Sequence, residues 1–309
     1  MPINIPCNLP AFETLSNENV FVMSDKDALR QDIRPLEVAI VNLMPTKIQT
    51  ETQLLRLLSN TPLQVNVTFI RTATHISKNA STEHLVMFYT TFEDIKEKYY
   101  DALFITGAPV ELLPFEQVTY WEELCKIMHW SKSHAFSTIH ICWGAQAGLY
   151  YHYGIDKKEL PRKLFGVFPQ KVHVKNHPLF KGFDDVFNVP HSRYTENCIE
   201  DIKKHPALTL LVSSELSGAH IIADKTGRQV FVTGHVEYDR ETLKGEYLRD
   251  VEKKLDTPLP YNYFPDDDPT KEPINSWFGH GSLMYSNWLN FCVYQKTPFK
   301  IEEIKPLTI

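Results

Sequence analysis

The stretch Ala135-Phe-Ser-Thr-Ile-His-Ile-Cys142-Trp143-Gly144-Ala-Gln-Ala-Gly148 decides the fold class of this chain. Its first half is mostly apolar or β-branched and predicts a buried strand over 135–142. Its second half, continued to Tyr153, predicts a helix over 143–153. Because small residues stand at the junction, the helix can begin directly after the strand and pack back onto it. A strand that passes straight into a helix is typical of parallel β–α–β units.

The rest of the chain repeats this alternation. The hydrophobic pattern predicts strands at 36–44, 63–71, 100–106, 208–213, 220–223 and 229–233, and helices at 49–58, 91–100, 120–130, 242–255 and 282–294. We therefore predict an α/β fold with a mainly parallel sheet and helices on both faces. We expect an irregular N-terminal arm over 1–34, a single α/β domain over 35–309, and exposed loops at 72–82 and 256–273.

Composition argues against several function classes. The 309 residues include 32 Lys and Arg against 38 Asp and Glu, a net charge of −6 without a long basic run, so we expect no nucleic-acid partner. No apolar run approaches the ~18–20 residues of a membrane span. The start, MPINIPCNLP, lacks the basic segment of a secretory signal, and the five cysteines are not closely spaced. We therefore expect a cytoplasmic protein with reduced thiols and no membrane association.

Glycine is scarce in this chain, so each glycine more often marks a backbone position that requires it. Twelve glycines in 309 residues are about 4%, against an average near ~7%, and none precedes Gly107. Four of them stand in turns that directly follow predicted strands: Gly107, Gly144, Gly148 and Gly234. Since ligands gather at the carboxyl ends of the strands in open α/β sheets, these turns are candidate parts of a site.

Cys142 is the candidate nucleophile. It occupies the sharp turn between the predicted strand and the predicted helix, where a helix N-terminus lowers the pKa of a thiol. The free backbone N–H groups of the first helical turn can also bind an oxyanion. Considered alone, a single cysteine is more often a small buried apolar residue.

His235 and Glu237 are the candidate acid–base pair. They follow the strand 229–233 in the sequence Gly234-His-Val-Glu237, and alternation along a strand points both side chains the same way. The imidazole can take a proton from Cys142 and return it, while the carboxylate orients the ring. A surface histidine in a salt bridge is the alternative. By contrast, His173 and His177 have no evident third partner, so we expect no metal site.

Five longer motifs carry a resemblance to a known family. They are Val41–Lys47 (VNLMPTK), His140–Gly148 (HICWGAQAG), Pro190–Tyr194 (PHSRY), Thr233–Arg240 (TGHVEYDR) and Trp277–Ser282 (WFGHGS). The order Cys, His, Glu resembles the class I glutamine amidotransferase-like fold. The motifs themselves resemble the MetA family of homoserine O-acyltransferases, over nearly the whole chain.

That resemblance implies a covalent mechanism. Cys142 attacks acetyl-CoA and becomes an acyl-thioester, and His235, oriented by Glu237, then deprotonates the hydroxyl of L-homoserine, which accepts the acetyl group. Acetyl-CoA is a co-substrate of this ping-pong reaction in methionine biosynthesis, with no further cofactor, and the family suggests a homodimer.

The same resemblance assigns binding residues. Lys163, Ser192 and Arg249 are implied to bind homoserine, whose carboxylate suits a bidentate arginine. From the sequence alone, an ion pair with Glu246 three residues earlier is the alternative for Arg249. We also expect Lys47 and Trp143 to contact the oxyanion or CoA.

Glu111 is implied to select the acyl donor. In the family, glycine here leaves room for succinyl, whereas glutamate accompanies acetyl transfer, because its carboxylate fills space and repels the succinyl carboxylate. A solvated loop glutamate is the alternative. Three other functions remain open: homoserine O-succinyltransferase, a glutamine amidotransferase-like hydrolase that releases ammonia, and a non-catalytic binding protein with this fold.

Overall fold

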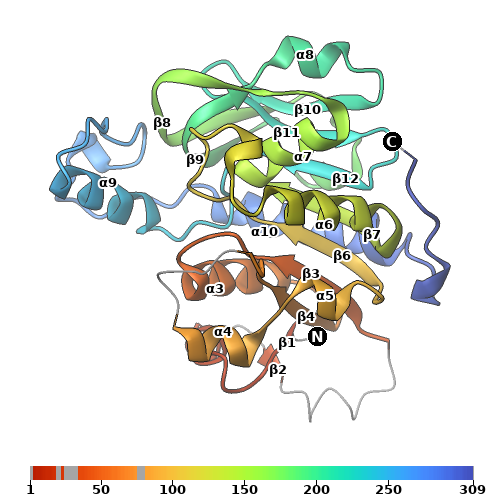
Figure 1. The fold of residues 1–309 in the computed structure, drawn as a ribbon. Coiled ribbons are helices and arrows are strands. Elements are labelled where there is room, and N and C mark those ends of the chain that lie inside the picture. Colours follow the sequence, from red (N-terminus) through yellow and green to blue (C-terminus); the bar gives the residue numbers. More distant parts are fainter. Residues whose placement is uncertain (1–2, 19–21, 24–33, 75–80, 309) are drawn as a thin grey trace.

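A computed structural model describes residues 3–18, 22–23, 34–74 and 81–308. These residues form one twelve-stranded sheet with the order β2-β1-β4-β3-β6-β7-β12-β11-β10-β8-β9, and β5 pairs with β4 (Figure 1). Strands from β2 to β12 pair in parallel, whereas those from β12 to β9 are antiparallel. The predicted α/β class with a mainly parallel sheet is confirmed.

The elements have the following bounds. The strands are β1 (Ile3–Asn4), β2 (Val22–Met23), β3 (Leu36–Val41), β4 (Val65–Ile70), β5 (Tyr89–Thr90), β6 (Tyr100–Ile105), β7 (Ala135–Ile141), β8 (Lys157–Val172), β9 (Val186–Asn197), β10 (Leu208–Ser214), β11 (Gly218–Asp224) and β12 (Gln229–Val232). The helices are α1 (Pro10–Asn17), α3 (Lys47–Leu58), α4 (Thr82–Phe88), α5 (Phe92–Ile95), α6 (Trp121–His134), α7 (Trp143–Tyr153), α8 (Ile199–Lys204), α9 (Thr242–Glu252), α10 (Phe278–Asn287) and the π-helix η4 (Trp288–Tyr294).

The parallel strands are apolar on both sides because helices cover both faces of the sheet. In β3, Val38 and Ile40 point into a core shared with α3, α10 and η4, whereas Ala39 and Val41 point into a core shared with α6 and α7. This arrangement explains the continuous hydrophobic run of β3 and confirms the predicted helical layers (Figure 1).

Helix α7 packs very closely on the sheet at its junction with β7. A Cβ on Gly144 would lie 2.6 Å from the carbonyl oxygens of Ile105 and Thr106, and one on Gly148 would lie 2.7 Å from the His140 ring. Both contacts are far closer than a real side chain tolerates, so α7 can sit on β6 and β7 only with glycine at these positions.

Three regions differ from the sequence prediction. The long hairpin β8–β9 was not predicted, and α4 and β5 follow the predicted loop at 72–82, of which 75–80 lie outside the described residues. The helix predicted at 91–100 is reduced to α5. The predicted loop at 256–273 is not wholly exposed, because Tyr263 and Phe264 are buried and Tyr261 pairs with Gly166 of β8.

The predicted irregular arm at 1–34 contains a regular helix in its described part. Pro10 begins α1, as proline can at the first position of a helix, and Ala11 and Leu15 are fully buried in the core. This part is therefore more ordered than the sequence predicted. Residues 1–2, 19–21 and 24–33 of the arm lie outside the described residues, and the division at 34 stays a prediction.

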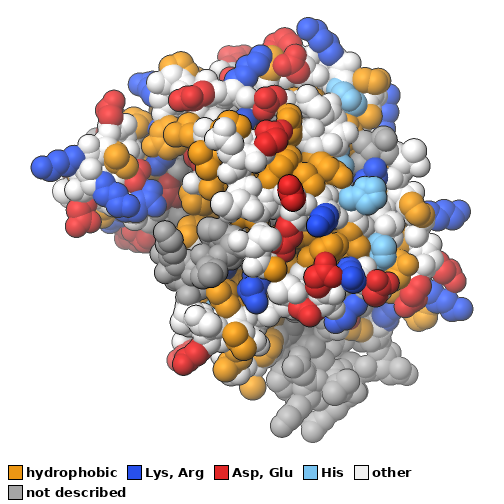
Figure 2. All heavy atoms as spheres, viewed as in Figure 1, with side chains coloured by type: hydrophobic (Ala, Val, Ile, Leu, Met, Phe, Trp, Pro, Cys, Tyr) orange, Lys and Arg blue, Asp and Glu red, His pale blue; other side chains and the backbone are white. Residues whose placement is uncertain are grey.

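Two general properties of the described part of the chain concern the charge of its surface and the length and polarity of its helices. On the face shown in Figure 2, acidic and basic side chains are interspersed. Among the helices of the described ranges, none has the length and apolar character needed to cross a membrane.

Candidate active site

A pocket of about 610 Å³ opens at the carboxyl ends of the parallel strands. Its walls are the segment after β3, α3, the segment after β6, the end of β7 with Cys142, the β8–β9 hairpin, the segment after β12 and α9. Cys142, His235, Glu237, Lys163, Ser192, Arg249 and Glu111 all line it, so the structure brings seven of the nine predicted residues together.

Cys142 sits between β7 and α7 in a strained backbone conformation. Its φ of 52° and ψ of −116° are unusual for a residue other than glycine, and such strain concentrates at functional sites. Its N–H donates to the carbonyl of Val232 at 2.7 Å. The first N–H groups of α7 have no acceptor within the helix, so they are available to an oxyanion beside the thiol.

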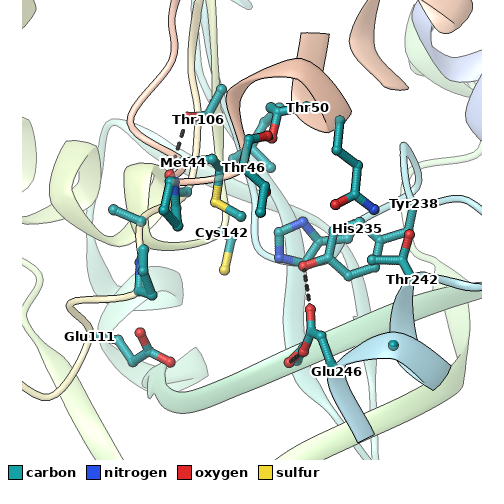
Figure 3. Close-up of a pocket in the computed structure, with 18 of the residues that line it drawn as sticks. Met44, Thr46, Thr50, Thr106, Glu111, Cys142, His235, Tyr238, Thr242 and Glu246 are labelled. Carbon is teal, nitrogen blue, oxygen red and sulfur yellow. Dashed lines mark hydrogen bonds between the residues drawn. The ribbon is translucent and has the colours of Figure 1, made fainter. Parts of the chain in front are cut away.

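His235 lies beside Cys142, and Figure 3 shows the sulfur close to the ring. Nδ1 of His235 is 2.6 Å from Oε1 of Glu237, and the ring stacks on Tyr238 with 4.1 Å between centroids. Burial alone lowers the pKa of His235, but the adjacent Cys142 and Glu237 outweigh it, so this pKa lies well above its ordinary value. The protonated form of His235 is therefore favoured at this place beside Cys142.

His235 and Glu237 lie in a loop, and not on a strand as the sequence pattern suggests. Strand β12 ends at Val232, so strand alternation does not orient these side chains. A tight turn does so instead, and the N–H of His235 donates to the carbonyl of Pro190 at 2.8 Å.

The motif WFGHGS supports this loop from behind. Nε1 of Trp277 donates to the carbonyl of Tyr238 at 2.9 Å. A Cβ on Gly281 would lie 2.8 Å from the carbonyl oxygen of Val236. Trp277 and Gly281 therefore position the residues next to the acid–base pair, a role that the sequence of the motif alone did not indicate.

Lys163 and Ser192 reach the pocket from one face of the hairpin. Ser192 pairs with Phe165 across β8 and β9, and Nζ of Lys163 lies 4.1 Å from the centre of the Phe165 ring. Nζ of Lys163 also donates to Asp250 at 2.8 Å and lies 3.6 Å from Glu246. Lys163 is therefore bound to α9 by these contacts, and Ser192 is bound to it by its hydrogen bond to Glu246.

Arg249 lies on α9 and is bound differently from the sequence alternative. Its Nε and Nη2 contact Oδ1 of Asp250 at 2.9 and 2.7 Å, so its direct partner is not Glu246. About half of its side chain is exposed, at 53%, which leaves the guanidinium accessible to a ligand in the pocket.

Glu246 is a candidate that the sequence reasoning missed. Oε2 of Glu246 accepts a hydrogen bond from Ser192 at 2.5 Å, and Oε1 accepts one from Tyr238 at 3.2 Å. The sequence presented it only as a helical neighbour of Arg249. Its spacing from Arg249 on the pocket face of α9 is the signal that could have identified it.

Glu111 extends into the pocket from the segment after β6. In Figure 3 both Glu111 and Glu246 lie below Cys142, Glu111 to the left and Glu246 to the right. Burial raises the pKa of Glu111 from its ordinary value, with the positive charges of Lys163 and His235 acting against burial. A second carboxylate close to Glu111 raises its pKa further, as the neighbouring Glu246 does.

Lys47 and Trp143 do not line the pocket. Lys47 is the first residue of α3 and is buried, with Nζ donating to the carbonyl of Asn42, and burial lowers its pKa to about 8. Trp143 is buried against Phe115 and Tyr120. The expected contacts of these two side chains with an oxyanion or CoA stay predictions. Within the described residues, no group of three His, Cys, Asp or Glu forms a metal-binding cluster.

Sequence comparison agrees with the motifs. A family model described as homoserine O-succinyltransferase matches residues 2–299. A homoserine O-acetyltransferase of Thermotoga petrophila is 58% identical over 304 residues, covering 98% of this chain and all of that protein. A homoserine O-acetyltransferase of Geobacillus sp. strain WCH70 is also 58% identical, over 302 residues, with the same coverage.

Solved structures with a similar fold are more distant in sequence. The protein SMU.1228c has a TM-score of 0.57 at 17% identity, covering 82% of this chain and 97% of that chain. A glutamine amidotransferase from Thermotoga maritima has a TM-score of 0.52 at 13% identity, covering 83% and 98%. At these identities the likeness concerns the fold, and it confirms the glutamine amidotransferase-like architecture.

Proposed function

The chain belongs to the homoserine O-succinyltransferase family, and from this premise we propose that it transfers an acetyl group from acetyl-CoA to the hydroxyl of L-homoserine. The family supports an acyltransferase, and relatives at 58% identity over nearly the whole chain are homoserine O-acetyltransferases. The observation that carries the proposal is the placement of Cys142, His235 and Glu237 at one pocket that also holds Lys163, Ser192 and Arg249.

In the first half-reaction, the Cys142 thiolate attacks the thioester carbonyl of acetyl-CoA. The carbon–sulfur bond to CoA breaks, CoA leaves as its thiol with a proton from His235, and an acetyl-thioester remains on Cys142. The backbone N–H groups at the start of α7 stabilise the negative oxygen that develops during this attack.

In the second half-reaction, homoserine occupies the pocket after CoA has left. His235 accepts the hydroxyl proton while Glu237 holds the ring in position, and the oxygen attacks the thioester carbonyl. The bond to Sγ of Cys142 breaks, which releases O-acetylhomoserine and restores the thiolate. The imidazolium that forms is stabilised by the contact of 2.6 Å to Glu237.

The charged side of the pocket suits an amino acid as the acceptor. The exposed guanidinium of Arg249 can bind the carboxylate of homoserine with two hydrogen bonds. Glu246, placed beside Ser192 and Tyr238, supplies a negative partner for its ammonium group. A substrate with both charges and a short side chain fits this arrangement.

Glu111 favours acetyl over succinyl as the donor. A succinyl group brings a second carboxylate into a region that already holds Glu111 and Glu246, whose charges repel it. Homoserine O-succinyltransferase remains the alternative, since the family description refers to succinyl transfer.

The remaining expectations follow from the proposed reaction. Acetyl-CoA is a co-substrate, no further cofactor takes part, and the product enters methionine biosynthesis. We also propose a cytoplasmic homodimer that binds neither nucleic acid nor membranes.

Intact-mass spectrometry after mixing with acetyl-CoA alone tests the mechanism. We expect an acetyl adduct that disappears when homoserine is added and that does not form on Cys142→Ala. A parallel sample with succinyl-CoA tests the donor, and a sample with glutamine tests ammonia release. No adduct with acetyl-CoA, or an adduct with succinyl-CoA only, would contradict the proposal.

A further inference from the structure

Gly245 stands in the interior of α9, where glycine is an unfavourable residue. Within a helix, glycine costs roughly 0.5–1 kcal/mol relative to alanine because it loses more backbone freedom on folding. Such a position usually has a compensating reason in the folded protein.

Neither the backbone nor the packing of α9 supplies that reason. Gly245 is not among the glycines with positive φ, so its backbone is open to any L-residue. A Cβ built on it meets no atom within 4 Å, unlike the one built on Gly144. What distinguishes Gly245 is that it lines the active-site pocket.

The pocket has two chemically different sides near Gly245. Charged groups gather on one side: Glu246, Arg249, Asp250 and Lys163. The side formed by α3 and the start of α9 includes the charged Glu241 but offers mostly neutral amides and hydroxyls: Thr46, Gln49, Thr50, Gln53 and Thr242. Figure 3 shows Thr46 and Thr50 across the view from Glu111 and Glu246.

Helices α3 and α9 converge at this neutral side. Nε2 of Gln53 donates to Oγ1 of Thr242 at 3.0 Å. Gln49 on α3 and Gly245 on α9, each one helical turn from this contact, also line the pocket. The pocket therefore reaches the gap between the two helices, and Gly245 contributes no side chain to it.

We propose that this gap holds the pantetheine arm of the acyl-CoA donor, and that Gly245 is a residue that determines donor specificity. The inference rests on the proposed function. The arm is slender and uncharged, with two amides and a hydroxyl that match Gln and Thr side chains. Homoserine is short and charged, and its partners lie on the other side. A side chain at position 245 excludes the arm without touching the acceptor groups.

The kinetics of Gly245→Leu test this assignment. In a ping-pong reaction, kcat/KM for the donor reports only the acylation half, and kcat/KM for the acceptor reports only the half that follows release of CoA. We expect kcat/KM for acetyl-CoA to fall by at least ~10-fold through steric exclusion. We expect kcat/KM for homoserine to stay unchanged, and so should turnover of S-acetyl-2-mercaptoethanol, which lacks the arm.

Two alanine variants separate the donor effect from helix stability. Gly279 is another helical glycine with nothing near its Cβ, on α10 and away from the pocket. We expect both Gly245→Ala and Gly279→Ala to raise the melting temperature, because alanine is the better helix former. Only Gly245→Ala should lower kcat/KM for acetyl-CoA.

The outcomes distinguish this inference from the proposed function. If the unmodified protein does not transfer acetyl from acetyl-CoA to homoserine, the proposed function fails. If it does, but Gly245→Leu leaves kcat/KM for acetyl-CoA unchanged, the inference is overturned. Equal losses with acetyl-CoA and the short thioester, or a loss confined to homoserine, overturn it as well.

Discussion

The half of the pocket that carries Cys142 and His235 is held by backbone packing, whereas the half that carries Lys163 and Arg249 is held by charged side chains. In the first, the strand-end half, the start of α7 lies so close to the sheet that a Cβ on Gly144 would come within 2.6 Å of two carbonyl oxygens. In the second, the hairpin–helix half, a carboxylate on α9 joins Lys163 to Arg249.

The difference follows from what each half does. Covalent chemistry needs a nucleophile fixed to a fraction of an ångström, and close backbone contacts provide this because they cannot relax cheaply. Recognition of a charged substrate needs a group that can exchange partners, which the half-exposed Arg249 can do. Mutations in the two halves should therefore change different kinetic constants.

Gly144→Ala should have the largest effect, because it acts on the strand-end half. The new Cβ clashes with two backbone carbonyl oxygens, so α7 must shift and carry Cys142 with it. We expect the free energy of unfolding to fall by about 3 kcal/mol. We expect kcat to fall at least ~100-fold, since a small misplacement of the nucleophile is costly.

Urea denaturation and acetyl-transfer assays measure these two effects, with Gly279→Ala as the matched control. An active and fully stable Gly144→Ala protein would show that backbone packing does not define this half.

Glu246→Gln should act on recognition alone. The variant keeps the shape and can still accept a hydrogen bond from Ser192, but it loses the charge proposed to face the ammonium of homoserine. We expect kcat/KM for homoserine to fall ~30-fold, in line with the loss of a hydrogen bond between charged groups. The value of kcat/KM for acetyl-CoA should not change.

Glu252→Gln is the control for this variant, because it lies on α9 outside the pocket. A loss of acetyl-CoA acylation in Glu246→Gln would mean that the two halves are not separable in this way.

Glu111 lies where the two halves meet, and its substitution should have the smallest effect. We expect Glu111→Gly to shift the ratio of kcat/KM for acetyl-CoA and succinyl-CoA toward succinyl by ~10-fold. Glu111→Gln keeps most of the volume and removes the charge, so it separates repulsion from size.

The pH dependence of donor discrimination independently tests whether the charge of Glu111 repels succinyl-CoA. Because burial raises its pKa, Glu111 gains a proton at a higher pH than an exposed glutamate does. Lowering the pH should therefore weaken discrimination against succinyl-CoA in the unmodified protein and leave Glu111→Gln unaffected. A parallel pH response in both proteins would assign the discrimination to another group.

The difference between the strand-end half and the hairpin–helix half also explains which parts of the site the sequence could predict. The parallel strands and the Cys142 turn were predictable because their pattern is local: apolar strands followed at once by small residues. The pair His235 and Glu237 was predictable from its place after β12, although a tight turn, not strand alternation, orients it.

The hairpin–helix half was harder to predict because its contacts join distant segments. The strand β8 contains Pro161, Pro169 and several charged residues, which argue against a strand in the sequence. Glu246 binds Ser192 from another element, so a local pattern could suggest only its pairing with Arg249. The burial of Lys47 away from the pocket likewise depends on the tertiary packing of α3.

The register of β8 and β9 limits how this protein can change over generations. Phe165 lies opposite Ser192 and Leu164 opposite Arg193, so Ser192 faces the pocket while Arg193 is buried on the other face. A slip of one residue exchanges the two faces. Single insertions or deletions within either strand would therefore remove acceptor recognition. Acceptor preference in this fold should thus evolve by substitution and not by changes of strand length.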